Sequence, residues 1–360
     1  MTLGTPAAER LPVTVITGFL GAGKTTLLNH LIRQPELSTA AVIINEFGAI
    51  SLDHELVEKT DGDIVEVKGG CLCCTVRGDL VEALHGLLLK RQKGEVRKFD
   101  RVIIETTGLA DPAPILHTFM SDPLAYDKFR LDGVVTVVDA VNGAATLDAH
   151  EEALKQAAIA DRLLVSKSDL ADPATLITRL KALNPGAKVI TVANGKLAPA
   201  EILDLGPFDP AAKGATVEAW LRAEADTQAD DHGHHHHHHD VNRHDARIRA
   251  FTYARNVPVK IDSLQFLLQL LAMMRGPDLL RVKGIVNVEG EPNTPAVIHG
   301  VQHVFHPVSW LKSWPSADRR TRLVFIVRDI TEAQIAELME SLDDTDVNEA
   351  TTAASAAKGA

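Results

Sequence analysis

The segment GFLGAGKT at residues 18–25 restricts the fold of this 360-residue chain more than any other feature. It has the spacing G-x-x-x-x-G-K-[ST] and lies between the strand-like run 13–17 and the helical run 25–33. Glycines let the backbone wrap around a phosphate, and N–H groups at a helix start then face the anion. The context therefore favours a nucleotide phosphate loop over a chance glycine-rich turn.

The residue types in this loop predict separate roles. Lys24 is expected to contact the β- and γ-phosphates, and the hydroxyl of Thr25 is expected to bind Mg²⁺. The full set that we expect at the phosphates is Gly18, Gly21, Gly23, Lys24, Thr25 and Thr26.

Short runs rich in Val and Ile alternate with helical stretches through the first two hundred residues. The expected strands are 13–17, 41–45, 63–67, 101–106, 134–140, 162–167 and 188–192. Nearly continuous apolarity is typical of parallel strands covered on both faces. We therefore predict an α/β P-loop NTPase domain with a mostly parallel sheet over residues 1–205.

The alternation of apolar runs and helical stretches ends at about residue 205. We predict a linker with a histidine-rich tract at 206–246, a smaller C-terminal α+β domain at 247–345 and a disordered tail at 346–360. A second apolar pattern begins at 247–255, and the elements expected after it are strands near 279–289, 296–305 and 321–328 and helices at 261–275 and 331–342.

The net charge and the lengths of the apolar runs disfavour two classes of partner, nucleic acids and membranes. The net charge of −11 disfavours nucleic acid, which needs basic patches. No apolar run approaches the roughly 18 residues of a membrane span, and we see no secretory signal. A cytoplasmic protein without a nucleic-acid or membrane partner is expected.

The segment SKSD at 166–169 ends a strand, where nucleoside contacts belong in an open α/β sheet. Asp169 can accept hydrogen bonds from guanine, and the stem of Lys167 can lie along the base. Ser166 replaces the Asn of the N-K-x-D pattern and weakens one contact. GTP is favoured over ATP, while an ordinary charged turn is the alternative.

Two further strand ends carry acidic residues. Glu105 is expected to bind Mg²⁺, and the backbone N–H of Gly108 to meet the γ-phosphate, which would make that loop a switch. Glu46 and Asp53 follow another strand in a second candidate switch loop. With Lys24 and Glu105 they form the predicted catalytic set, although both could instead be solvated loop charges.

All three cysteines of the chain, Cys71, Cys73 and Cys74, lie at a predicted strand-to-helix junction. Clustered thiols in a reducing compartment favour metal binding or redox chemistry. Thiolates at C-x-C-C spacing suit Zn²⁺, with one coordination position left open for release. A redox-active Cys71–Cys74 pair and simple packing remain alternatives.

A histidine tract lies within the predicted linker. Its metal-ligand candidates are His232, His234, His235, His236, His237, His238 and His239. Neutral imidazoles bind Zn²⁺, Ni²⁺ or Co²⁺, so a run of them predicts weak, fast-exchanging capture. A solvated linker without function is the alternative.

The chain resembles the CobW-type GTPases, a family of metallochaperones. The resemblance rests on TGFLGAGKTTLLNHLI (17–32), NEFG (45–48), GGCLCC (69–74), ETTGLADP (105–112), VVDA (137–140) and SKSDL (166–170). It implies GTP hydrolysis with Mg²⁺, coupled to delivery of Zn²⁺ or Co²⁺ to a client metalloprotein.

The resemblance also implies that Cys71, Cys73 and Cys74 are the internal metal motif. Two other functions stay open: a nucleotide-gated metal buffer or sensor without significant turnover, and a phosphotransferase acting on a small acceptor. The client, the cognate metal and whether the chain forms a homo-oligomer are left open by the sequence.

Overall fold

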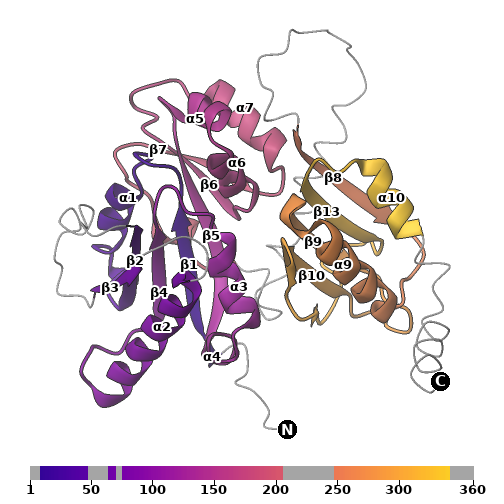
Figure 1. Ribbon diagram of the computed structural model, residues 1–360, viewed down its shortest axis with the longest axis horizontal. Coiled ribbons are helices and arrows are strands. Elements are labelled where there is room, and N and C mark those ends of the chain that lie inside the picture. Colours follow the sequence, from indigo (N-terminus) through magenta and orange to yellow (C-terminus); the bar gives the residue numbers. More distant parts are fainter. Residues whose placement is uncertain (1–8, 48–63, 70–74, 206–246, 341–360) are drawn as a thin grey trace. The chain divides into compact units, whose positions relative to one another are not determined.

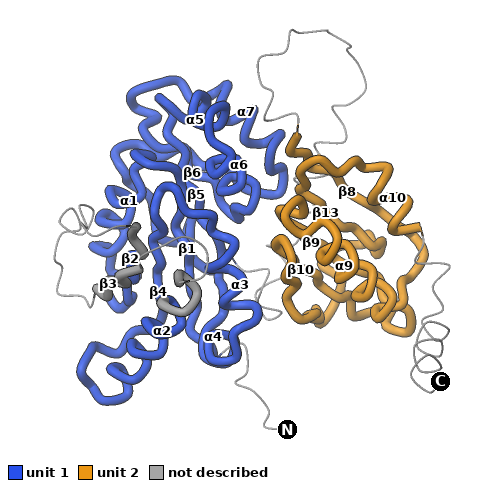
Figure 2. The backbone as a smooth tube through the Cα atoms, viewed as in Figure 1, with its two compact units in different colours: residues 1–246 blue, residues 247–360 orange. Residues whose placement is uncertain are grey.

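The computed structural model describes residues 9–47, 64–69, 75–205 and 247–340, with the backbone alone for 45–47, 64–69 and 75–79. The chain divides into two compact units, residues 1–246 and residues 247–360 (Figure 2). Each unit has its own sheet and its own hydrophobic core.

In its described part, unit 1 is built on seven strands that all pair in parallel (Figure 1). The strands are β1 (Leu11–Thr17), β2 (Ala40–Phe47), β3 (Ile64–Gly69), β4 (Arg101–Thr106), β5 (Phe129–Asp139), β6 (Arg162–Ser166) and β7 (Lys188–Val192). Their order across the sheet is β3-β2-β4-β1-β5-β6-β7. The predicted α/β fold with its parallel sheet is confirmed.

Helices lie between the strands of unit 1, apart from the step from β2 to β3, where residues 48–63 lie outside the described ranges. They are α1 (Lys24–Leu31), α2 (Thr75–Lys93), α3 (Ala113–Ser121), α4 (Pro123–Lys128), α5 (Gly143–Ala149), α6 (Glu151–Ala158) and α7 (Ala174–Leu183). Local chemistry sets some of their ends: the Asp122 carboxylate accepts from the backbone N–H groups of Leu124 and Ala125 at the start of α4.

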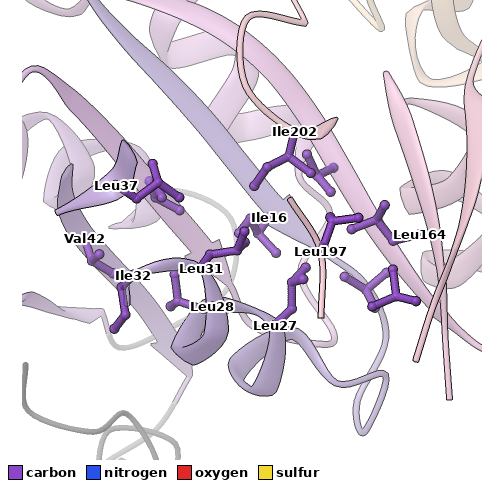
Figure 3. Packing of buried hydrophobic residues seen from close by; sticks show 14 of the residues in the cluster. Ile16, Leu27, Leu28, Leu31, Ile32, Leu37, Val42, Leu164, Leu197 and Ile202 are labelled. Atoms are coloured by element: carbon purple, nitrogen blue, oxygen red, sulfur yellow. The ribbon is translucent and has the colours of Figure 1, made fainter. Parts of the chain in front are cut away.

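On one face of this sheet, α1 packs against the strands and against residues 197–205, and together they form a hydrophobic core. Leu27, Leu28 and Leu31 of α1 lie with Ile16 of β1, and Ile202 closes the same cluster (Figure 3). Val13 and Val15 of β1 are also buried but point away from that cluster. Burial on both faces explains the continuous apolar strands.

Unit 2 is an antiparallel sheet with helices. Its strands are β8 (Ile248–Arg255), β9 (Leu279–Val286), β10 (Ala296–Val301), β11 (Val304–Phe305), β12 (Ser309–Trp310) and β13 (Thr321–Arg328). The order is β11-β10-β9-β13-β8, with β12 paired to β10. Helices α9 (Ile261–Arg275) and α10 (Glu332–Glu340) contribute Leu264, Leu268 and Ile335 to its core. The smaller α+β fold is confirmed.

One predicted strand of unit 2 is wrong. Residues 296–305 form a hairpin, because Gln302 has a φ of 52° and turns the chain back. Val304 pairs with Val301, and the ring of Phe305 lies against Gly300, which has no side chain to obstruct it. The backbone N–H of His306 consequently donates to the carbonyl of His299 across the hairpin.

No helix in the described part of the chain combines the length and the apolarity that a bilayer crossing requires.

We predict that Leu28→Ala lowers the free energy of unfolding of unit 1 by about 2–5 kcal/mol, because the side chain is fully buried in the α1 core. Chemical denaturation of the full chain measures this value. The control is Leu89→Ala on α2, where a side chain that is 41% exposed should lose under about 1 kcal/mol. Equal losses for the two variants would contradict the assigned core.

Candidate nucleotide site

The phosphate loop turns through three glycines with positive φ. Gly18, Gly21 and Gly23 have φ angles of 140°, 72° and 94°, a region that side chains strongly disfavour. A Cβ atom on Gly18 would also lie 2.2 Å from the carbonyl oxygen of Val137. The loop can therefore pass against β5 only with glycine at its first position, and α1 begins directly after it at Lys24.

Lys24 is buried against its own loop. Its Nζ donates to the carbonyl oxygens of Gly18 at 2.9 Å and Phe19 at 3.1 Å. These bonds hold the ammonium at the turn of the loop, where backbone N–H groups and the start of α1 also favour an anion.

A hydroxyl and a carboxylate meet beside the loop. The Oγ1 of Thr25, in the first turn of α1, donates to the Oε1 of Glu105 at 2.8 Å. Glu105 is buried near the end of β4, where it pairs with Ile16 of β1 in the sheet. Both groups are hard oxygen donors, the ligand chemistry that Mg²⁺ prefers.

The loop after β4 packs directly on the phosphate loop. A Cβ on Gly108 would lie 2.5 Å from the backbone nitrogen of Leu20, so only glycine permits this contact. Thr106 Oγ1 donates to Thr17 Oγ1 at 2.7 Å in a buried bond between the ends of β4 and β1. The amide of Gln156 on α6 donates to the carbonyls of Gly108 and Ala110.

A pocket of about 240 Å³ opens at the end of β6. Ser166, Lys167 and Asp169 line it, together with Thr26 from α1 and Asn194 from the turn after β7. Asp169 is exposed at the rim. The Ser166 hydroxyl donates to the carbonyl of Ala22 at 2.6 Å and so ties this strand end to the phosphate loop.

Lys167 is held by Asp139, which ends β5. Lys167 has a left-handed φ of 55°, and its Nζ lies 2.6 Å from Asp139 Oδ2. Burial alone would raise the pKa of Asp139, but hydrogen bonds from Lys167, the Val141 N–H and Asn142 outweigh it and lower that pKa. Because folding lowers the pKa of Asp139, its carboxylate stabilises the folded chain at any pH above the ordinary carboxyl pKa. This contribution to folding stability is lost only as the pH falls through the lowered pKa. The ion pair is therefore intact at neutral pH.

The sequence patterns assign no role to several residues of this site. Asp139 stands at the end of an apolar strand, as Glu105 does near the end of its own, and this signal could have found it. Asn194 and Gly195 form an Asn-Gly turn after β7, and Gly195 packs on Thr26. Gln156 carries no sequence signal, because a lone Gln in a helix is ordinary.

The other predicted residues are placed only in part. Glu46 lies in β2 with its backbone alone described, and Asp53, Cys71, Cys73 and Cys74 lie outside the described residues. The histidine tract lies outside them as well. Within the described ranges, no three His, Cys, Asp or Glu side chains gather as metal ligands.

Three features together define the class of protein, a P-loop GTPase. They are the phosphate loop, the Thr25–Glu105 pair and the base-side pocket, which is the pocket that Ser166, Lys167 and Asp169 line. Residues 12–191 match the CobW/HypB/UreG nucleotide-binding domain, and residues 248–343 match the cobalamin synthesis protein CobW C-terminal domain. The chain therefore belongs to the CobW family.

Named relatives span nearly the whole chain. It is 33% identical over 326 residues to the zinc chaperone YjiA of Escherichia coli, covering 90% of this chain and 96% of YjiA. It is 31% identical over 368 residues to the zinc chaperone CobW of Pseudomonas aeruginosa, covering 92% and 91%. The crystal structure of Zn(II)-bound YjiA GTPase aligns with a TM-score of 0.65 at 28% identity, over 92% of this chain and 99% of that one.

We predict that Asp139→Asn weakens GTP binding about fivefold, because it releases the ammonium of a partly exposed Lys167 beside the base-side pocket. Fluorescent nucleotide titration measures the dissociation constant. The control is Asp148→Asn, which breaks the ion pair with Arg179 in the same unit and lines neither pocket described here. An unchanged affinity in Asp139→Asn, or an equal loss in the control, would contradict the role of Asp139.

Proposed function

We propose that this GTPase is a metallochaperone that binds Zn²⁺ through Cys71, Cys73 and Cys74 and delivers it to a client metalloprotein. The nucleotide state sets the zinc affinity of the cysteine site. The names of the relatives support zinc as the cargo, because both YjiA and CobW are zinc chaperones. A relative from Schizosaccharomyces pombe, named a zinc-regulated GTPase metalloprotein activator, supports a metalloprotein client.

The parallel register of the sheet carries the proposal. Strands β1, β4, β2 and β3 all end at one edge, with Glu105 beside Ile16, Thr106 beside Asn45 and Gly69 beside Phe47. Neighbouring strands lie about 4.8 Å apart, so the three steps from β1 to β3 span roughly 14 Å. Cys71 follows Gly69 by two residues, and α2 begins one residue after Cys74. On this proposal we expect the cysteines near the edge of the sheet that holds the phosphate loop.

A second connection runs through helices. The loop at residues 107–112 leads into α3, where Asp111 Oδ1 accepts from the Ala113 N–H at 2.9 Å. Helix α3 packs against α2, whose first residue, Thr75, follows the last cysteine. A shift of Gly108 on loss of the γ-phosphate would thereby reach the cysteine segment at the end that leads into α2.

GTP is expected to lie with its phosphates at the phosphate loop and the loop at 107–112, and with its base in the pocket at the end of β6. The glycines of the phosphate loop, Lys24 and the N–H of Gly108 would bind the phosphates, and Lys167 and Asp169 would hold guanine. Ser166 contributes by fixing the pocket to the phosphate loop, and Thr26 by lining it. Thr25 and Glu105 would hold Mg²⁺, which offsets phosphate charge when it is bound. Glu46 and Asp53, in the second candidate switch loop, remain candidates for the catalytic set with Lys24 and Glu105.

The zinc site is expected to be open rather than closed. Three thiolates satisfy three of the four tetrahedral positions of Zn²⁺, which leaves one for a client ligand during transfer. The histidine tract between His232 and His239 would capture Zn²⁺ or Co²⁺ weakly before the cysteines receive it.

We predict that Zn²⁺ binds tightly to the Mg²⁺–GTP-analogue form and at least about tenfold more weakly to the GDP form, since a gating ligand must bind the two states differently. The test is a competition titration with a chelator on protein lacking residues 232–244, without nucleotide and with each nucleotide. The Co²⁺–thiolate absorption band reports whether thiolates bind the metal. Cys73→Ser should abolish both the tight Zn²⁺ binding in the competition titration and the Co²⁺–thiolate band.

The outcomes separate the candidate functions. Equal affinity in all three nucleotide conditions would contradict gating. Nucleotide-dependent affinity without GTP turnover, even with zinc and client, would favour the buffer or sensor. No metal binding at the cysteines would leave redox chemistry as their role.

A further inference from the structure

Gln156 is a buried polar residue that no role assigned so far explains. It lies on α6 with no exposed surface, and its Nε2 donates to the carbonyl of Gly108 at 3.2 Å and to that of Ala110 at 3.0 Å. Both amide hydrogens thus donate to one loop, residues 107–112, whose Gly108 N–H is expected to meet the γ-phosphate. The bonds reach across 48 and 46 residues of sequence.

The acceptor end of the same amide indicates why Gln is present. Gln156 Oε1 is buried and has no hydrogen-bond partner among the described residues. A buried polar atom without a partner is unfavourable, and an apolar side chain of similar volume would avoid it. The donated bonds to the loop are therefore what distinguishes Gln from a packing residue here.

Helix α6 also contacts the phosphate loop itself. His150, which precedes its first residue, stacks on Phe19 with ring centroids 4.3 Å apart and planes at 26°. Phe19 and Gln156 both line a cavity of about 110 Å³ on the side of Leu20 and Gly21. The Thr136 hydroxyl of β5 donates to the Gln156 carbonyl at 2.7 Å and fixes the helix to the sheet. One short helix thus connects the phosphate loop with the loop at 107–112.

We propose that Gln156 is a positioning residue for GTP hydrolysis. Its amide holds the peptides of Gly108 and Ala110 so that the Gly108 N–H faces the γ-phosphate. Loss of the amide hydrogens frees the loop and reduces both the rate of hydrolysis and the discrimination between GTP and GDP. Gln156 itself exchanges no proton and forms no bond to the nucleotide. This inference rests on GTP as the nucleotide of the proposed function and is independent of zinc.

The chain contains a matched control, Asn184 at the end of α7, that bonds to the same helix. Asn184 is also a buried amide, and its Nδ2 donates to the carbonyls of Ala157, Ala158 and Ala160 at 2.9, 3.0 and 2.9 Å. These bonds fix the far end of α6 and touch neither loop. Asn184→Asp therefore removes comparable donated bonds at a place that should affect stability alone.

The experiment compares Gln156→Met, Gln156→Glu and Asn184→Asp with the unaltered full-length chain, with Mg²⁺ and without transition metal. Single-turnover hydrolysis gives the rate, and titrations give the affinities for GDP and a non-hydrolysable GTP analogue. We expect both Gln156 variants to lose about tenfold in rate and about fivefold in GTP-over-GDP preference, with the GDP affinity within about twofold. Asn184→Asp should lower the melting temperature and leave the preference unchanged.

Three results would overturn the proposal. They are an unchanged rate and preference in both Gln156 variants, an equal loss of GDP and GTP-analogue binding, and a loss of preference in Asn184→Asp that matches the Gln156 variants. Because no assay contains zinc, a failure of nucleotide-gated zinc binding would leave these results standing. Failure of the Gln156 variants to respond would equally leave the cysteine site untouched.

Discussion

The close passage of Gly18 against β5 is the contact on which the nucleotide site depends. The loop has room between the sheet and its own helix only because position 18 carries no side chain next to the Val137 carbonyl. That passage brings the N-terminus of α1, Lys24 and Thr25 to the carboxyl edge of the sheet. A parallel sheet places every strand end at this edge, so acidic and glycine residues from distant segments meet there.

Buried hydrogen bonds then fasten the loops of this edge to one another. Thr106 to Thr17 joins two strand ends, Ser166 to Ala22 joins the base side to the phosphate loop, and Gln156 holds the loop at 107–112. Each of these bonds links segments far apart in sequence. A ligand that displaces one loop therefore disturbs its neighbours, and the proposed nucleotide-dependent change at the cysteines would depend on this coupling.

Much of this could be predicted from the chain alone. The strands and helices of unit 1 follow from apolar runs and glycine spacing, and the phosphate loop has a local signature because its function depends on local backbone geometry. The predicted strand at 296–305 is wrong because apolar residues lie on both sides of Gln302, Val301 before it and Val304 after it, and apolarity does not distinguish a hairpin from one strand. The positions of Asp139 and Gln156 required the fold.

The sequence by itself determined the residues that can touch phosphate, because glycines and a lysine at fixed spacing act within a single turn of chain. It also determined the seven strand-forming runs, since side-chain apolarity is a property of each segment. Only the tertiary structure decided that Asp139 holds Lys167 and that Gln156 holds Gly108. These contacts depend on sheet order and helix packing, which bring together residues 28 and 48 positions apart that no local pattern connects.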